Sequence, residues 1–447
     1  MPHAETNTSN DASQPRLRRV LSTRLLYFFI LGDVLGAGVY VLVGQVATAS
    51  GGAVWVPLLT ALLLALLTAA SYAELATKYP RAGGASHYAT LAFGPAAGFC
   101  MLAAGIVSTA ALTRGFAGDY LSAFVTLPVA LVAVVFLVVL ALVNARGVKE
   151  STRANVVATL IELGGLAVVV VLGAWLLLRG DGDPGRLTRL GTPEKGAAAA
   201  VLGGSVLAYY SFVGFETSVN VAEETRDPRR AYPRALFGAL ATAGTVYVLV
   251  GIAASAAVPT EVLARSSGPL LEVVHAAGGV PPRLFSAIAL VAVANGALLT
   301  GIMASRLAYG MARDGLLPAA LTRLLPRRRT PWAAIAATTV PALSLALTGS
   351  VATLASTLVL LLLVVFLIVN TAVLVLRREQ GPPGHFRVPS VLPVLGLVSC
   401  VLLATQVEAE VWLRTAVVLG VAAVLAVVPA VRRHRADRAN RDGQDGG

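Results

Sequence analysis

The sequence predicts an all-α integral membrane protein with about 12 transmembrane helices, and its composition and apolar windows carry this prediction. Of its 447 residues, 56% are hydrophobic and only 13% are charged, whereas soluble globular proteins have about 25% charged residues. A transmembrane helix needs about 20 predominantly apolar residues. Twelve windows of comparable length leave little sequence for a soluble domain. They cover residues 25–47, 53–76, 94–123, 127–143, 156–178, 197–221, 235–258, 284–311, 332–347, 353–376, 391–406 and 411–431.

The distribution of Lys and Arg orients these windows. With a cytoplasmic amino terminus, 27 of the 35 Lys and Arg residues fall on the cytoplasmic side, as the positive-inside rule requires. Both termini of a multi-pass cell-membrane protein are therefore expected in the cytoplasm, with residues 1–24 as a disordered tail and residues 432–447 as a second tail. Topology explains the net charge of +12. The expected partner is the lipid bilayer, and nucleic acid is excluded.

Two windows contain segments that favour an interruption of the helix. Gly36-Ala37-Gly38 lies near the middle of the first window, and residues 212–216 (FVGFE) lie in the sixth. Glycine destabilises a helix interior by about 1 kcal/mol relative to alanine in water, although in membranes it also permits tight helix packing, which is the alternative. The first and sixth spans are equivalent if the chain forms two five-span halves. Interrupted helices at equivalent positions indicate a transporter site.

Several blocks of the chain resemble the amino acid–polyamine–organocation family of transporters, and the first span resembles its cationic amino acid transporter branch. The blocks are residues 35–44 (LGAGVYVLVG), 71–76 (SYAELA), 79–84 (YPRAGG), 212–216 (FVGFE), Glu223-Glu224, Asp227-Pro228, Pro233, 305–318 (SRLAYGMARDGLLP) and 329–331 (RTP). The resemblance implies two inverted five-helix repeats, residues 25–178 and 197–376, followed by two helices in residues 391–431. It also implies amino acid transport by alternating access.

The resemblance further implies where the substrate binds. Backbone amides of residues 36–38 are expected to bind the substrate carboxylate, as the amino terminus of a half-helix can. Backbone carbonyls near Leu35 and in residues 212–214 are expected to accept hydrogen bonds from the α-ammonium group. Phe212 stands where the family often places an aromatic lid, with packing inside the bundle as the alternative. The predicted contacts are Leu35, Gly36, Ala37, Gly38, Phe212, Val213 and Gly214.

Three acidic residues fall inside predicted spans, where an ionised side chain costs about 2.5 to 3.5 kcal/mol on insertion scales. Asp33 and Glu162 each lie about eight residues, or about 12 Å, from the cytoplasmic end of their span and can face each other. Members of the family that do not use sodium often have a lysine near the position of Glu162, so the role of that lysine does not transfer. The pair is interpreted as a proton site. There are two alternatives. In one, Asp33 or Glu162 pairs with an arginine or caps freed backbone amides of the first span without titrating. In the other, the two acids coordinate sodium with Thr300 or Ser305.

Glu216 directly follows the interruption in the sixth span. Three roles are open for it: titration with pH, selection of a positively charged substrate, or acceptance of hydrogen bonds from freed backbone amides. Glu74 and Glu223 are expected at cytoplasmic helix ends. The family resemblance favours a cytoplasmic gate for both, and a solvated rim with little energetic weight is the alternative.

The remaining residues give no sign of catalysis. Cys100 and Cys400 lie in apolar windows and the five His residues are scattered, so no metal, cofactor or disulfide is predicted. The sequence therefore predicts a secondary amino acid permease that is not an enzyme, with the proton as expected coupling ion. Exchange, sodium symport of a neutral or polyamine-like substrate, and a channel or membrane sensor are the alternatives. Cationic and neutral amino acids both fit, and the need for an auxiliary subunit is open.

Overall fold

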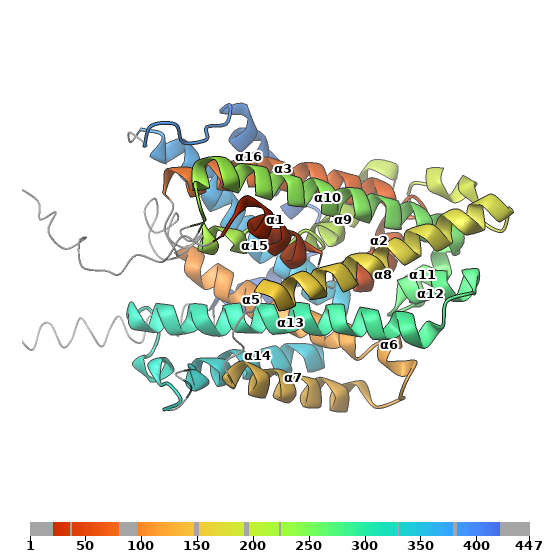
Figure 1. The fold of residues 1–447 in the computed structure, drawn as a ribbon, viewed down its shortest axis with the longest axis horizontal. Helices are drawn as coiled ribbons and strands as arrows, with labels where there is room; N and C mark the ends of the chain where they lie inside the picture. The colour runs from red at the N-terminus through yellow and green to blue at the C-terminus, as the bar shows by residue number, and fades with distance from the viewer. Residues whose placement is uncertain are drawn as a thin grey trace, which may run out of the picture.

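The computed structural model describes residues 21–35, 38–79, 96–146, 152–191, 196–222, 225–326, 328, 330–378 and 382–420 (Figure 1). Gly36, Ala37 and Glu223, three of the predicted site residues, lie outside these ranges. Within the described ranges the regular structure is helical, apart from an isolated β-bridge between Leu21 and Thr225. The prediction of an all-α fold is confirmed.

The helices run side by side along the long axis of the molecule, with α11 and α12 together at one end (Figure 1). The α-helices are α1 Thr23–Val34, α2 Gly38–Ser50, α3 Trp55–Lys78, α5 Ala96–Phe116, α6 Asp119–Ser122, α7 Val129–Ala145, α8 Thr152–Arg179, α9 Ala197–Tyr210, α10 Pro228–Ala257, α11 Thr260–Arg265, α12 Pro269–Ala277, α13 Pro282–Arg313, α14 Trp332–Thr348, α15 Val351–Leu376 and α16 Val391–Ala404. The 3-10 helices are η1 Pro184–Thr188, η2 Thr217–Val221 and η3 Ala319–Thr322.

Six of the described helices are long and apolar enough to cross a membrane, namely Trp55–Lys78, Gly98–Ser122, Val156–Arg179, Pro228–Ala257, Pro282–Arg313 and Val351–Leu376. Two bent pairs raise this number to eight: α1 with α2, bent by 45°, and Val391–Ala404 with Ala409–Gly420, bent by 110°. The apolar helices α7, α9 and α14 are shorter. Up to residue 420 each predicted window coincides with a helix or a helix pair, and the count of twelve crossings stays a prediction.

Helices that are far apart in sequence pack closely in the bundle. α13 and α15 both lie against α5, and α10 lies against α1, α3 and α8. Gly244 and Gly251 permit the approach of α10 to α3, because a Cβ at these positions would fall 2.4 Å from Leu62 and 2.8 Å from Leu58. Small residues at contacts of this kind let membrane helices approach each other, and here they allow α10 to pack closely against α3.

The first span is interrupted between α1 and α2, as the sequence predicts. α1 begins after Ser22, whose hydroxyl oxygen accepts a hydrogen bond from the amide of Leu25, and its last helical residue is Val34. α2 begins at Gly38. In a continuous helix the carbonyl of residue i accepts from the amide of residue i+4, so the interruption frees the carbonyl of Val34 and the amide of Gly38.

The sixth span is interrupted as well. α9 ends at Tyr210, residues 211–216 form turns, and η2 continues the chain from Thr217. Gly214 has φ = +129°, in a region that glycine enters without the steric penalty of a Cβ. The interruption within residues 212–216 is therefore confirmed. At both predicted positions the helix is interrupted.

Two short helices that no apolar window predicts, α11 and α12, connect α10 to α13. Asp119, at the end of the third span, holds the segment between them. Its Oδ2 accepts hydrogen bonds from the amides of Ser267 (2.8 Å) and Gly268 (3.2 Å) and from the hydroxyl of Ser266 (3.0 Å). In addition, a Cβ at Gly44 of α2 would fall 2.2 Å from the carbonyl oxygen of Leu263. These contacts hold α11 and α12 against α2 and the end of the third span.

Candidate functional site

The two interruptions lie directly against each other. A Cβ at Gly38, the first residue of α2, would fall 2.8 Å from the Cα of Ser211 and 3.2 Å from a ring carbon of Tyr210. A Cβ at Gly214 would fall 2.6 Å from the carbonyl oxygen of Asp33. The non-helical backbone of the sixth span therefore crosses the break of the first span in van der Waals contact. Such an approach requires glycine on both sides of the crossing.

Side chains occupy two of the backbone groups at this crossing. The hydroxyl of Tyr247 on α10 donates a hydrogen bond of 2.6 Å to the carbonyl of Val34, which the break has freed from the helix. The carboxylate of Glu216 accepts a hydrogen bond of 2.8 Å from the amide of Gly214 through Oε2. Buried backbone polar groups need such partners, because leaving one unpaired costs about 1–3 kcal/mol. Of the three roles open for Glu216, the cap of a freed amide is the one with a visible contact.

Helix ends of opposite polarity meet at the crossing. The carboxyl end of α1 carries a partial negative charge, and the amino end of α2 carries a partial positive charge. They are separated along the chain only by residues 35–37. Helix ends of opposite partial charge thus adjoin each other at the crossing.

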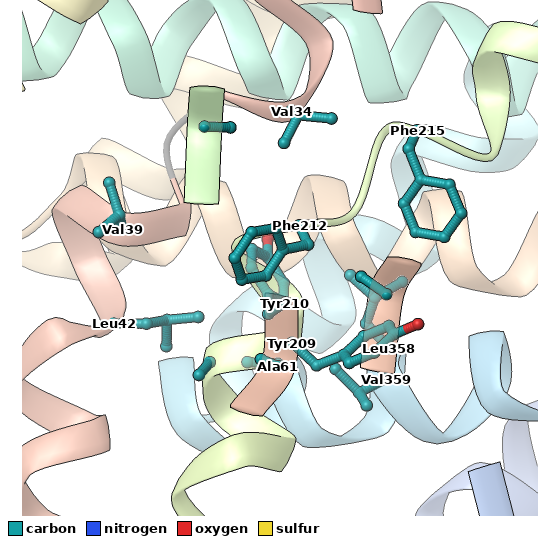
Figure 2. Close-up of a cluster of buried hydrophobic side chains, with 14 of the residues drawn as sticks. Val34, Val39, Leu42, Ala61, Tyr209, Tyr210, Phe212, Phe215, Leu358 and Val359 are labelled. Carbon is teal, nitrogen blue, oxygen red and sulfur yellow. The ribbon is translucent and has the colours of Figure 1, made fainter. Parts of the chain in front are cut away.

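Aromatic and aliphatic side chains surround the crossing. Phe212 is fully buried and lies among Val34, Val39 and Leu42 in the cluster of Figure 2. Its ring meets that of Tyr247 edge to face, with 5.2 Å between the centroids. This arrangement is compatible with both alternatives for Phe212. The residue is packed inside the bundle, and it covers the break on which the substrate is expected. Leu35 is also fully buried and Val213 is half-buried.

Glu162 is a fully buried acid on α8. Its Oε1 accepts a hydrogen bond of 3.2 Å from Nδ2 of Asn295 on α13, and its Oε2 has no hydrogen-bond partner among the described residues. The backbone carbonyl of Glu162 accepts a hydrogen bond of 2.7 Å from the hydroxyl of Tyr40 on α2. α8 is thereby connected to α2 and to α13. The free carboxyl oxygen can bind a proton or a small cation.

Asp33 is the third acid of the predicted spans. It is half-buried near the end of α1 and its Oδ2 accepts a hydrogen bond from the hydroxyl of Thr217 in η2. Its charge acts on Glu162 and on Glu216. The structure thus brings Asp33 and Glu162 into electrostatic contact. The described residues contain no group of three His, Cys, Asp or Glu side chains arranged for a metal ion.

The ligands named for the sodium alternative lie elsewhere. Thr300 is within 3.2 Å of the hydroxyl of Thr109 on α5, and Ser305 accepts a hydrogen bond of 3.1 Å from Asn144 on α7. Neither contacts Glu162, whose partner on α13 is Asn295. In the described part of the chain the hydroxyls of Thr300 and Ser305 thus bond toward α5 and α7, and the alternative of a sodium site that they share with Glu162 stays untested.

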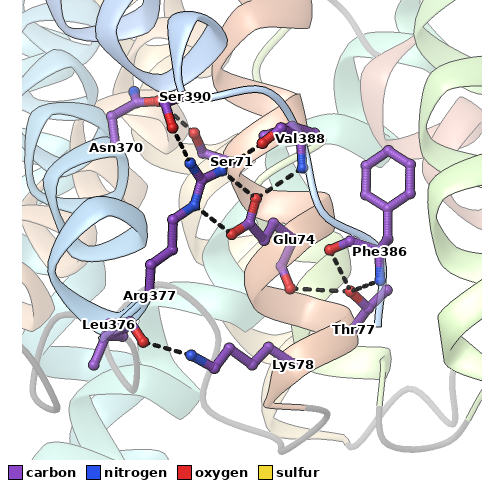
Figure 3. A network of polar contacts seen from close by, with 10 residues as sticks. All are labelled: Ser71, Glu74, Thr77, Lys78, Asn370, Leu376, Arg377, Phe386, Val388 and Ser390. Carbon is purple, nitrogen blue, oxygen red and sulfur yellow. Dashed lines mark hydrogen bonds and ion pairs between the residues drawn. The ribbon is translucent and has the colours of Figure 1, made fainter. Parts of the chain in front are cut away.

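Glu74 lies in a polar network where α3, α15 and the segment before α16 meet (Figure 3). Arg377 donates to both of its carboxylate oxygens, at 2.8 Å from Nε and 2.6 Å from a terminal nitrogen, and the amide of Val388 donates at 2.9 Å. Thr77 bonds the backbone of Phe386, and Lys78 donates to the carbonyl of Leu376. The hydrogen bonds to Glu74 raise the pKa of Arg377 above its usual value. Glu74 is thus buried and paired, not part of a solvated rim.

Sequence reasoning missed three residues of these networks: Tyr247, Asn295 and Arg377. Tyr247 and Asn295 are polar residues within apolar windows, which is a signal for an interior contact. Their partners are Val34 and Glu162, which are remote in the chain, so the sequence does not identify them. Arg377 was counted among the cytoplasmic basic residues that set the topology. Its pairing with Glu74 depends on the packing of α3 against α15.

Sequence similarity connects this arrangement with known transporters. The family model described as amino acid permease matches residues 21–432. The chain is 32% identical over 418 residues to an uncharacterized transporter of Mycobacterium tuberculosis, which covers 91% of this chain and 90% of the relative. It is 30% identical over 389 residues to the vacuolar cationic amino acid transporter 4 of Arabidopsis thaliana (81% and 64%), and 25% identical over 452 residues to a branched-chain amino acid permease of Bacillus subtilis (91% and 93%). The predicted resemblance is confirmed, and the chain belongs to the amino acid permease family of multi-pass membrane transporters.

Proposed function

We propose that the protein is a secondary permease that moves an α-amino acid across the cell membrane by alternating access, with a proton as the coupling ion. The observation that carries the proposal is the contact between the two interrupted spans, at Gly38 with Ser211 and at Gly214 with Asp33. Non-helical backbone at membrane depth is tolerated only where it is buried in protein or lines a cavity. Broken helices that meet between repeats are characteristic of transporter binding sites.

In this proposal the substrate binds at the crossing. The amides of Gly36, Ala37 and Gly38 bind its carboxylate at the amino end of α2. Carbonyls at Leu35 and in residues 212–214 accept from its ammonium group, and Phe212 covers it. Residues 25–178 and 197–376 form the two inverted repeats that move relative to each other, and both termini lie in the cytoplasm.

The coupling proposal rests on Oε2 of Glu162, which has no hydrogen-bond partner among the described residues, and on the negative charge of Asp33, which acts on Glu162. Two carboxyls that interact in a medium of low dielectric constant favour a state in which one of them holds a proton. Because Asp33 belongs to the end of α1, a movement of α1 changes this interaction and hence the proton occupancy. Sodium symport is the second candidate, since the same two carboxyls supply the hard oxygen ligands that sodium prefers.

Glu216 and the inner gate complete the proposal. Glu216 stabilises the bent backbone at Gly214 by accepting a hydrogen bond from its amide. Glu74 and Glu223 act at the cytoplasmic mouth, where Glu74 forms an ion pair with Arg377. The relatives are named for cationic and for branched-chain amino acids, so both a cationic and a neutral substrate are proposed.

Uptake into proteoliposomes tests this function. The purified chain is offered a panel of labelled cationic and neutral amino acids and a polyamine, under an inward proton gradient, an inward sodium gradient or neither. Saturable accumulation of one amino acid class that requires the proton gradient is the expected result. Accumulation driven by sodium alone favours the second candidate. No uptake above that of protein-free vesicles contradicts transport by this chain.

A further inference from the structure

Asn295 is the single hydrogen-bond partner of the Glu162 carboxyl group within the described part of the chain. It lies near the middle of α13 and is half-buried, while Glu162 on α8 is fully buried. The hydrogen bond joins Nδ2 of Asn295 to Oε1 of Glu162 over 3.2 Å. α8 and α13 also pack along each other, since a Cβ at Gly165 would fall 2.6 Å from Ile288. Asn295 therefore sets where the carboxyl points.

The titratable groups that face Glu162 from other helices make no hydrogen bond to its carboxyl. They are Asp33 on α1, Tyr40 on α2 and Tyr247 on α10. The hydroxyls of Tyr40 and Tyr247 donate to the backbone carbonyls of Glu162 and Val34. Asp33 is the acid whose negative charge acts on Glu162. Within the described part of the chain, the balance between the two charge states of Glu162 thus depends on the repulsion by Asp33 and the hydrogen bond from Asn295.

A primary amide is suited to a partner that changes its charge. An asparagine side chain carries two donors and an acceptor, whereas a carboxylate only accepts and a protonated carboxyl also donates. Asn295 can donate to the carboxylate through Nδ2 and, after rotation of its amide, accept from the protonated form through Oδ1. A leucine at this position bonds neither form. An aspartate adds a third charge beside Asp33.

We infer that Asn295 is a positioning residue for proton coupling, which fixes the orientation of the Glu162 carboxyl and sets the pH at which it gains a proton. The inference rests on the proposed function for its role in transport. Its structural part, the control of Glu162 by Asn295, is independent of the substrate. A hydrogen bond from Asn295 to the charged carboxylate is stronger than one to the neutral acid, so the loss of Asn295 is expected to make Glu162 keep a proton to higher pH.

Carbodiimide labelling tests this inference without any substrate. Dicyclohexylcarbodiimide adds a protonated carboxyl across one of its C=N bonds, and the adduct at Glu162 is measured by mass spectrometry over a range of pH. For Asn295→Leu the labelling midpoint is expected to rise by about one pH unit, which corresponds to about 1.4 kcal/mol. Asn295→Ala removes the same donor with less crowding and serves if the leucine variant does not fold.

Asn144→Leu is the matched control, because Asn144 also donates to α13, at Ser305, and makes no contact with Glu162. Its labelling midpoint is expected to equal that of the native chain. An unchanged midpoint in both Asn295 variants, or a failure of Glu162 to label at any pH at which the protein stays folded, overturns the inference.

Uptake then separates the inference from the proposed function. The pH profile of uptake is expected to move in Asn295→Leu and to show no further change when Asn295→Leu is added to Glu162→Gln. A shift that persists in the Glu162→Gln background means that Asn295 acts elsewhere, which overturns its assignment. If the native chain moves no amino acid, the proposed function fails, and the labelling result still decides how Asn295 acts on Glu162.

Discussion

Gly214 of the sixth span lies against the carbonyl of Asp33 in the first, so closely that a Cβ at position 214 would stand 2.6 Å from that oxygen. The contact joins the two interruptions that form the candidate binding site. It also links three acids, because the amide of Gly214 is bonded by Glu216 and the charge of Asp33 acts on Glu162. A change at Gly214 therefore reaches both the substrate site and the coupling pair.

The variant Gly214→Ala is expected to lose more than about tenfold of the uptake rate, which corresponds to about 1.4 kcal/mol. An alanine must adopt φ = +129° and displace the backbone at Asp33, and backbone strain of this kind costs of the order of 1–3 kcal/mol. Initial uptake rates in proteoliposomes measure the effect. Gly203→Ala in α9 is the control, since no atom lies within 4 Å of its Cβ position. Equal rates for both variants contradict the role of the crossing.

Substitutions of Glu216 distinguish its hydrogen bond to the amide of Gly214 from an effect of its negative charge. Glu216→Gln retains an oxygen that accepts from the amide of Gly214, so uptake is expected to stay within about fivefold of native, the change that corresponds to the net worth of about 1 kcal/mol of a neutral hydrogen bond. Glu216→Leu leaves this buried amide unpaired and is expected to lose both stability and uptake. The two variants are compared by uptake rate over a range of pH. If Glu216→Gln abolishes uptake or its pH dependence, the charge is essential and the cap alone is an insufficient account.

The pair of Glu74 and Arg377 is expected to stabilise the fold. Their side chains are only 2% and 11% exposed, and removing one partner of a buried pair costs about 3 kcal/mol or more. Glu74→Gln is therefore expected to lower the thermal unfolding midpoint of the purified protein clearly. Glu410→Gln breaks the exposed pair with Arg414, worth less than about 1 kcal/mol, and is expected to change the midpoint little. Similar unfolding midpoints for the two variants would show that the Glu74 network contributes little to the stability of the fold.

Tyr247→Phe removes the hydroxyl that bonds the freed carbonyl of Val34 and keeps the ring that meets Phe212. The expected result is a loss of about 1–3 kcal/mol in stability, because the buried carbonyl is left without its partner. Tyr27→Phe is matched to it, since Tyr27 also joins α1 to α10, through Thr242, at a partly exposed position. Thermal unfolding of both variants is the measurement, and Tyr27→Phe is expected to be milder. An equal or smaller effect for Tyr247→Phe means that the carbonyl finds another donor.

Local sequence patterns predicted the parts of the site that depend on the chain itself. The interruptions at Gly36-Ala37-Gly38 and in residues 212–216 follow from glycines at matching positions of two apolar windows. The ends of α1 and α9 agree with them. The depth of Asp33 and Glu162 in their helices indicates that the two acids can face each other, and this stays a prediction.

Contacts between remote helices were beyond the reach of these patterns. The partner of Glu162 is Asn295 and not Thr300 or Ser305, because the rotation of α13 about its axis decides which of its polar residues faces α8. Glu74 meets Arg377 only because α3 packs against α15. Periodicity within one helix does not give the rotation of that helix relative to its neighbours, and three-dimensional packing does.

Gradient-driven uptake by the native chain and by Glu162→Gln is the most direct test of the account. Both proteins are reconstituted, and accumulation of the preferred amino acid is compared with and without an inward proton gradient, with exchange against preloaded substrate as the control for folding. The account predicts that the native chain accumulates substrate only with the gradient and that Glu162→Gln exchanges substrate without accumulating it. Equal accumulation by both proteins under the gradient would contradict Glu162 as the proton site.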